Sequence, residues 1–223
     1  MFPIGDDNEA RRSIPVVTFV LIALNVAFFF IQLNGGETFL RQWAFVPARF
    51  AQNPAADWPT VFSAMFMHGG WLHLGGNMLY LWIFGDNVED VFGPVKFLLF
   101  YLACGIAATF AQYYINAGSR IPNVGASGAI AGVLGGYLIL YPRARVRCLW
   151  ILIVFITTIV LPAWVLLGLW FLSQFFIPTH SGVAWMAHVG GFVAGVALVR
   201  IFTLGRWPRP ERAPPSVFYQ YRY

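Results

Sequence analysis

Long runs of apolar residues, separated by short polar stretches, are the feature that most constrains how this chain can fold. Only 10% of its 223 residues are charged and 59% are hydrophobic, whereas a soluble domain carries about 25% charged residues. Mean hydropathy is +0.67. Because apolar runs of about 20 residues match the ~30 Å hydrocarbon core of a bilayer, the sequence predicts an all-α, polytopic membrane protein.

Six runs are apolar enough to predict transmembrane helices. They lie at about 16–33, 70–84, 95–115, 126–141, 149–172 and 183–203. The first is longer than the ~7–15-residue core of a signal peptide. Between the first two runs the chain is aromatic but interrupted by prolines, which predicts a long interfacial loop at 34–69. We therefore expect three parts: an N-terminal segment at 1–15, a membrane domain at 16–203 and a disordered tail at 204–223.

The basic residues predict how the chain is oriented. Six spans place both termini on one side of the membrane, and 11 of the 14 Lys and Arg residues fall on that side. The other side carries only Arg41, Arg49 and Arg120. The positive-inside rule then places both termini in the cytoplasm. The net charge of +5 predicts no nucleic-acid partner, because the arginines flank apolar runs, where membrane topology explains them.

A few polar side chains lie inside the apolar runs and fall at similar depths. Counting ~1.5 Å per residue from the cytoplasmic ends puts Ser127, His188 and His73 about 18–21 Å up a ~30 Å core. Asn77 lies one helical turn deeper than His73, at about 14 Å. All four can therefore share one site near the bilayer centre or in its outer half.

These residue types predict serine-based acyl transfer. A serine hydroxyl is barely ionised at neutral pH and needs a base, which His188 can supply to Ser127. No Asp or Glu lies inside a predicted span, so we expect a Ser–His dyad. His73 and Asn77 are four residues apart on one helix face and can stabilise an oxyanion together with the backbone N–H of Ser127.

Small residues predict that the helices carrying Ser127 and His188 pack closely. Gly128 and Gly132 are spaced four apart on one helix, and Gly191 and Gly195 on the other. Such stripes let membrane helices pack backbone to backbone. Taken alone, they are also typical of ordinary helix packing, and a membrane serine is usually a packing or backbone-bonding residue. A histidine beside one stripe and a serine on the other favour a site.

Four motifs resemble those of rhomboid intramembrane serine proteases, in order and spacing, over about residues 16–203. They are MFMHGGWLHLGGN at 65–77, GDNVED at 85–90, GASG at 125–128 and AHVGGFVAG at 187–195. The resemblance implies a six-helix rhomboid-like bundle with Ser127 as nucleophile and His188 as general base and acid. His73, Asn77 and the Ser127 N–H would form the oxyanion hole.

The resemblance also implies roles for the residues around these groups. His68, Gly125, Ala126 and Gly128 would line the water-filled active-site cavity, and Gly191 and Gly195 would contact the fourth helix. Glu89 would have a structural role. One position departs from the family, since many members carry an aromatic residue beneath the histidine where this chain has Ala131.

The activity implied is cleavage of transmembrane segments through an acyl-enzyme, with no metal or organic cofactor. Single-span or other transmembrane substrates would enter laterally from the lipid, past the fifth helix. The protein would be integral to a membrane, the plasma membrane of a prokaryote, with its active site opening to the outer side.

Two alternatives stay open. One is a catalytically inactive rhomboid-like protein that binds transmembrane clients, although such proteins typically lack the serine or the histidine. The other is a metal- or proton-transport protein using His68, His73, His180 and His188. The second is disfavoured because no acidic or cysteine ligand accompanies these histidines at depth and no helix has paired-His metal spacing.

Overall fold

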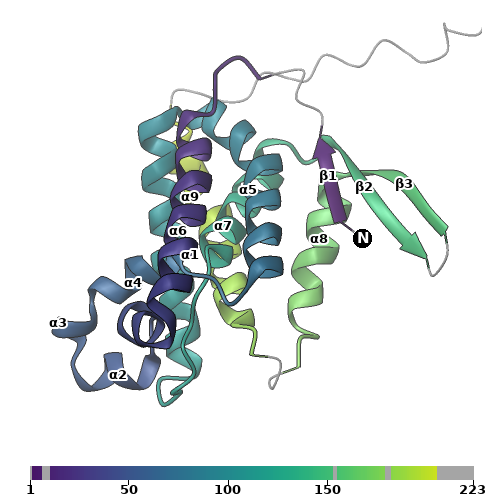
Figure 1. Cartoon of the computed structure of the whole chain (residues 1–223). Helices are drawn as coiled ribbons and strands as arrows, with labels where there is room; N and C mark the ends of the chain where they lie inside the picture. Colours follow the sequence, from purple (N-terminus) through teal and green to yellow (C-terminus); the bar gives the residue numbers. More distant parts are fainter. Residues whose placement is uncertain (1, 7–10, 153–154, 179–181, 205–223) are drawn as a thin grey trace, which may run out of the picture.

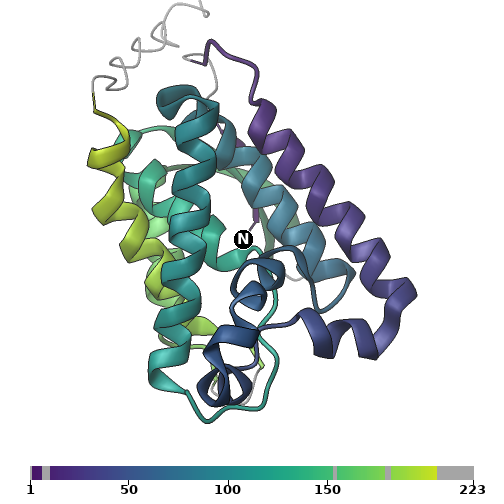
Figure 2. The same ribbon diagram turned by 90° about the vertical axis from the view of Figure 1, so that its left-hand side faces the viewer.

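A bundle of helices forms the body of the computed structural model (Figures 1 and 2), which describes residues 2–6, 11–152, 155–178 and 182–204. The main helices are α1 (Val16–Trp43), α5 (Trp71–Phe92), α6 (Pro94–Ile115), α7 (Ser127–Leu140), α8 (Ala163–Gln174) and α9 (Trp185–Phe202). Beyond Leu204, the predicted tail lies outside the described residues, and so does His180.

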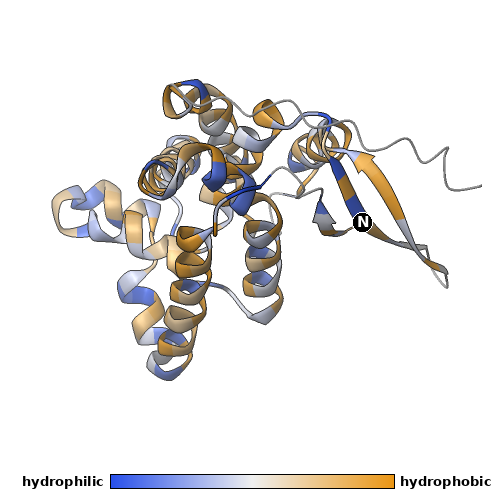
Figure 3. Cartoon of the chain, turned by 90° about the horizontal axis from the view of Figure 1, so that it is seen from above, coloured by the Kyte–Doolittle hydropathy of each residue, from blue (hydrophilic) through white to orange (hydrophobic). Residues whose placement is uncertain are grey.

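Three of these helices are long and apolar enough to cross a membrane: α1, α6 and α9. The apolar helices α7 and α8 are shorter. Figure 3 shows that the helices are hydrophobic along much of their length. Some of these residues are exposed, for example Phe19, Leu24 and Phe30 on α1. The protein is therefore a mostly helical integral membrane protein.

The prediction of an all-α chain is wrong at one place. Residues expected to begin the fifth helix at 149 instead form a hairpin of β2 (Arg145–Leu152) and β3 (Phe155–Pro162). Strand β1 (Phe2–Asp6) pairs antiparallel with β2, giving the sheet order β1-β2-β3 beside α8 (Figure 1). The segment is rich in Ile, Val and Thr, whose branched side chains favour strands. The fifth helix, α8, therefore begins only at Ala163.

The connection expected as a loop at 34–69 is largely helical. Helix α1 continues past a kink at Gly36 to Trp43. It is followed by the short helices α2 (Pro47–Gln52), α3 (Pro54–Asp57) and α4 (Pro59–Ser63) and by the 3-10 turn η1 (Ala64–Phe66). A proline begins each of the three short helices, where its missing N–H leaves no hydrogen bond unmade. The prolines thus divide the connection into short helices.

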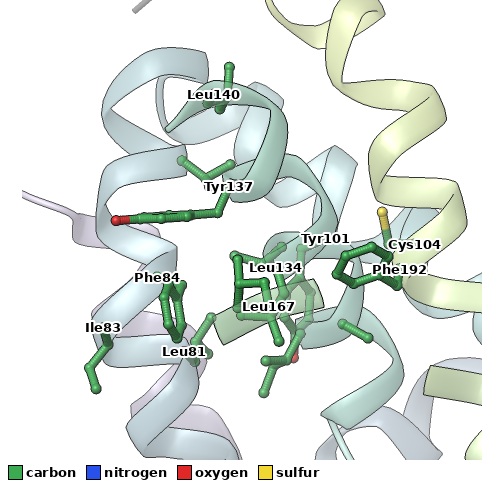
Figure 4. Packing of buried hydrophobic residues seen from close by; sticks show 14 of the residues in the cluster. Leu81, Ile83, Phe84, Tyr101, Cys104, Leu134, Tyr137, Leu140, Leu167 and Phe192 are labelled. Carbon is green, nitrogen blue, oxygen red and sulfur yellow. The ribbon is translucent and has the colours of Figure 1, made fainter. Parts of the chain in front are cut away.

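The apolar core lies among α5, α6, α7, α8 and α9 (Figure 4). The rings of Phe84 and Tyr137 meet edge to face, with centroids 5.0 Å apart, and Leu81, Leu134 and Leu167 fill the space beside them. Helix α7 is buried along most of its length. This burial fixes the helix whose first residue is Ser127.

Candidate active site

Ser127 is the first residue of α7, and the loop before it is anchored to the connection. Asn123 and Phe45 exchange backbone hydrogen bonds of 2.8 and 3.2 Å, and the N–H of Gly125 donates to the carbonyl of Ala64 at 2.9 Å. Gly125 has a φ of +129°, which side-chain-bearing residues rarely adopt. The loop therefore delivers Ser127 to a helix start, where backbone N–H groups lack intrahelical acceptors.

Helices α7 and α9 pack backbone to backbone through the predicted glycines. A Cβ added to Gly191 would lie 2.0 Å from the carbonyl oxygen of Gly128, and one added to Gly195 would lie 2.0 Å from that of Gly132. Both distances are far below any real contact of a Cβ atom. Only glycine therefore permits this separation of the two helices.

The close packing brings the predicted serine and histidine together. Nε2 of His188 lies 2.9 Å from Oγ of Ser127. The other ring nitrogen of His188, Nδ1, lies 2.7 Å from Oε1 of Gln174, the last residue of α8. The Trp170 ring packs on the imidazole, with centroids 6.0 Å apart. The side chain at Ala131 is buried but too small to pack as an aromatic ring would.

His73 presents its Nε2 toward the serine. Its Nδ1 accepts the backbone N–H of Gly69 at 3.2 Å, so in the neutral ring Nε2 carries the proton. Nε2 lies 2.8 Å from the point where a Cβ of Gly125 would stand, and Oγ of Ser127 lies 3.5 Å from the same point. A donor thus faces the space beside the hydroxyl, and the glycine keeps that space open.

Asn77 lies one turn further along α5 and supplies a second donor. Its side chain is buried, and Nδ2 has no hydrogen-bond partner among the described residues. The side chains of the site open into a cleft of about 930 Å³, which is lined by His73, Asn77, Tyr80, Ser127, Trp170 and His188. This volume is large enough for an extended peptide segment.

A smaller cavity of about 40 Å³ lies beside Ser127, toward α6. It is lined by Gln112 and Asn123, whose Oε1 and Nδ2 find no partner within the described part of the chain. One water needs about 10–15 Å³ and several polar partners. The cavity therefore has room and hydrogen-bonding groups for two or three water molecules next to the hydroxyl.

The remaining predicted cavity residues divide into two groups. Ala126 and Gly128 are buried against Ser127 at the start of α7. His68 is fully buried between η1 and α5, with its ring centroid 5.1 Å from that of His73. Within the described ranges, His, Cys, Asp and Glu side chains form no group of three that could hold a metal ion.

Two residues of the site were not predicted to contact the histidine: Gln174 and Trp170. The fifth helix, which carries both residues, was expected only to border the path of the substrate, and Gln174 was given no role. The available signal was an amide in an otherwise apolar helix, since polar side chains at membrane depth are costly and usually functional. Which face of α8 carries it was not readable from the sequence.

Comparison with known proteins gives a consistent family. The family model described as the Rhomboid domain matches residues 55–204. The Rhomboid protease GluP of Bacillus subtilis is 37% identical over 126 residues, which cover 56% of this chain and 24% of that protein. The mitochondrial Rhomboid protein 1 of Saccharomyces cerevisiae is 27% identical over 187 residues, covering 82% of this chain and 46% of the yeast protein.

A human protein matches a shorter stretch. The mitochondrial presenilin-associated rhomboid-like protein of Homo sapiens is 31% identical over 107 residues, covering 46% of this chain and 28% of that protein. The chain thus spans less than half the length of each of these three curated relatives.

Proposed function

Because this chain belongs to the rhomboid family, we propose that it is a serine endopeptidase that cleaves transmembrane segments of membrane proteins. The observation that carries the proposal is the 2.9 Å distance between Oγ of Ser127 and Nε2 of His188 at the edge of a peptide-sized cleft. A hydroxyl hydrogen-bonded to an imidazole is the arrangement that activates a serine nucleophile.

The first half of the reaction is acylation. Oγ of Ser127 attacks the scissile carbonyl as its proton passes to Nε2 of His188. The developing oxyanion accepts hydrogen bonds from Nε2–H of His73, from Nδ2–H of Asn77 and from the backbone N–H of Ser127. The imidazolium then protonates the leaving amine, the C–N bond breaks, and the substrate's acyl group stays on the serine.

The second half is hydrolysis of the acyl-enzyme. The cavity beside Gln112 and Asn123 supports a local supply of water, which the surrounding lipid cannot provide. His188 takes a proton from the attacking water and returns it to Oγ of Ser127, so that the acid product leaves and the enzyme is restored. Neither half requires a metal or an organic cofactor.

The substrate is proposed to be a transmembrane helix that unwinds near the cut. Backbone groups of a membrane helix are already hydrogen-bonded, so a carbonyl reaches the serine only after local unwinding. The cleft is lined from α5 by Tyr80 and from α8 by Trp170, which supports lateral access between these two helices. The proposal also includes the topology: six spans, both termini in the cytoplasm and an active site that opens to the outer side of the membrane.

Co-expression with a model single-span substrate tests this function. We expect cleavage by the wild type and loss of the product band with Ser127→Ala and with His188→Ala, while Ser119→Ala, in a surface loop, retains cleavage. Labelling with a fluorophosphonate should follow the same pattern. A folded wild type that neither cleaves nor labels would favour the inactive client-binding alternative.

A further inference from the structure

Gln174 makes hydrogen bonds on both sides of its amide, and these fix its orientation. Its Nε2 donates to the carbonyl oxygen of Trp170 at 2.8 Å and to Oγ of Ser173 at 3.2 Å. Its Oε1 lies 2.7 Å from Nδ1 of His188. A carbonyl oxygen can only accept, so the NH₂ group must face Trp170 and the amide oxygen must face the imidazole.

The orientation of the amide dictates where the imidazole carries its proton. Oε1 of Gln174 has no hydrogen to donate, so a hydrogen bond with Nδ1 requires the proton on Nδ1. In the neutral ring Nε2 is then unprotonated, and its lone pair faces Oγ of Ser127. This is the tautomer that can accept the proton of the serine. The opposite tautomer would present N–H to the hydroxyl and could not act as a base.

We propose that Gln174 is a positioning residue, which holds His188 in the tautomer and orientation that accept the Ser127 proton. The inference rests on the proposed protease function and extends the two-residue dyad by a third, uncharged member. The amide takes the place that an aspartate holds in the triads of soluble serine proteases. At this position the amide avoids burying a carboxylate, whose charge is costly at membrane depth.

Helix α8 also contributes the ring that packs on the imidazole. Trp170 lies one turn before Gln174, and its ring is tilted by 37° to that of His188. Rotation of the imidazole out of line with Ser127 would therefore lose a hydrogen bond and a ring contact together. Since many family members place an aromatic residue four positions after the serine, where this chain has Ala131, α8 supplies from another direction what α7 lacks.

The nitrogen chemical shifts of His188 test the proposal independently of activity. The protein is labelled with ¹⁵N-histidine and purified in detergent micelles, and the His188 signals are identified by their loss in His188→Ala. We expect a protonated, pyrrole-type Nδ1 and an unprotonated, pyridine-type Nε2 in the wild type. Gln174→Met keeps the length of the side chain but removes the acceptor, so a mixture of tautomers should appear.

Kinetics on the model substrate give the second measurement. Loss of the acceptor should lower kcat by about 10- to 100-fold, with KM changed by less than about two-fold, because His188 rather than substrate binding is affected. Gln174→Glu, which retains an acceptor toward Nδ1, should keep the single tautomer and more activity than Gln174→Met. Rescue by the residue that keeps the acceptor separates positioning from packing.

Gln32→Met is the matched structural control. Gln32 is also buried and hydrogen-bonds through both ends of its amide, to the backbone of His68, but it does not contact His188. Its loss should reduce stability and leave the His188 nitrogen shifts as in the wild type. The two glutamine variants are thus comparable in chemistry and differ in their neighbour.

Two results would overturn the proposal. One is Gln174→Met with wild-type nitrogen shifts and wild-type kcat. The other is Gln174→Met with reduced stability and activity but an unchanged tautomer, since that outcome makes Gln174 a packing residue. A wild type that cleaves nothing counts against the protease function alone, because the nitrogen shifts still decide the role of Gln174.

Discussion

The two ends of α5 both carry buried polar side chains, yet they differ in what those side chains bind. At the C-terminal end, carboxylates bind the residues that lead into α1. Asp86 pairs with Arg11 at 2.6 Å, and Asp90 accepts the backbone N–H of Ser13 at 2.7 Å. Polar groups at this end are used to hold the chain together.

Glu89 is the clearest case at that end. Its side chain is only 2% exposed, and its carboxylate accepts the backbone N–H groups of Val17 and Thr18 at 2.8 and 2.7 Å. It also accepts the Thr18 hydroxyl at 2.8 Å. These N–H groups begin α1 and have no intrahelical acceptor, and a negative charge at a helix N-terminus is favourable. One residue therefore caps a helix that lies far away in the sequence.

At the N-terminal end of α5 and in the loop before it, His73 is hydrogen-bonded to Gly69, but other buried polar groups are unpaired within the described part of the chain. Neither ring nitrogen of His68 nor Nδ2 of Asn77 has a hydrogen-bond partner among the described residues. A buried polar group without a partner costs about 1–3 kcal/mol, so such groups persist where water or substrate completes them. The comparison teaches that one end of the helix uses its polar groups to stabilise the fold, whereas the other has donors and acceptors that are free to bind water or a ligand.

Among substitutions at the two ends of α5, Asn77→Ala should have the largest effect on the reaction. Removing one donor to the oxyanion should lower kcat by about 10²- to 10³-fold. Stability should change by less than about 1 kcal/mol, because Nδ2 makes no hydrogen bond to any described residue that the substitution would break. Cleavage of the model substrate and thermal unfolding in detergent measure the two quantities. A large loss of stability with normal kcat would erase the contrast between the ends of α5.

Glu89→Gln should have the converse effect. It removes the charge and one acceptor from the cap of α1, which should destabilise the fold by about 3 kcal/mol, while the folded fraction keeps its kcat. Thermal unfolding and kcat per folded molecule are the measurements. Glu37→Gln is the control, since Glu37 forms an exposed pair with Arg41 worth only about 0.3–0.5 kcal/mol. Equal stability of the two variants would contradict the capping role.

Much of this architecture follows from apolar runs and small-residue spacing. The predicted run at 95–115 becomes α6 (Pro94–Ile115), and the glycine stripes indicated which helices pack closely. The start of the fifth helix could not be read in the same way, because a continuous apolar run fits a helix or a buried strand. What decides for strands is pairing with β1, more than 140 residues earlier, as between Phe2 and Leu149.

Individual hydrogen-bond partners were beyond reach for a related reason. The bond between Gln174 and His188 depends on how α8 is rotated about its axis and on the rotamers of both side chains. Neither the rotation nor the rotamers produce a periodic pattern in the sequence of a helix that is apolar on all sides. Stripes of glycine do produce a periodic pattern, because they repeat every four residues. The site was therefore predictable as a pair of helices, but not down to the third residue.

His68 is expected to have the smallest effect on the protein, and this effect depends on pH. It lies in the loop between η1 and α5, and burial, with a smaller contribution from nearby His73, lowers the pKa of His68 from 6.5 to about 4. Below pH 6.5 the unfolded chain therefore binds a proton that the folded chain rejects, so stability falls as the pH decreases toward 4. At pH 5 the loss should be about 1–2 kcal/mol relative to pH 7.5. His68→Gln should remove this part of the pH dependence in thermal unfolding measured at both pH values.

If the wild type and the variant lose the same stability between pH 7.5 and 5, then His68 is charged or solvated in the folded protein, and the N-terminal end of α5 is not the unpaired site described above.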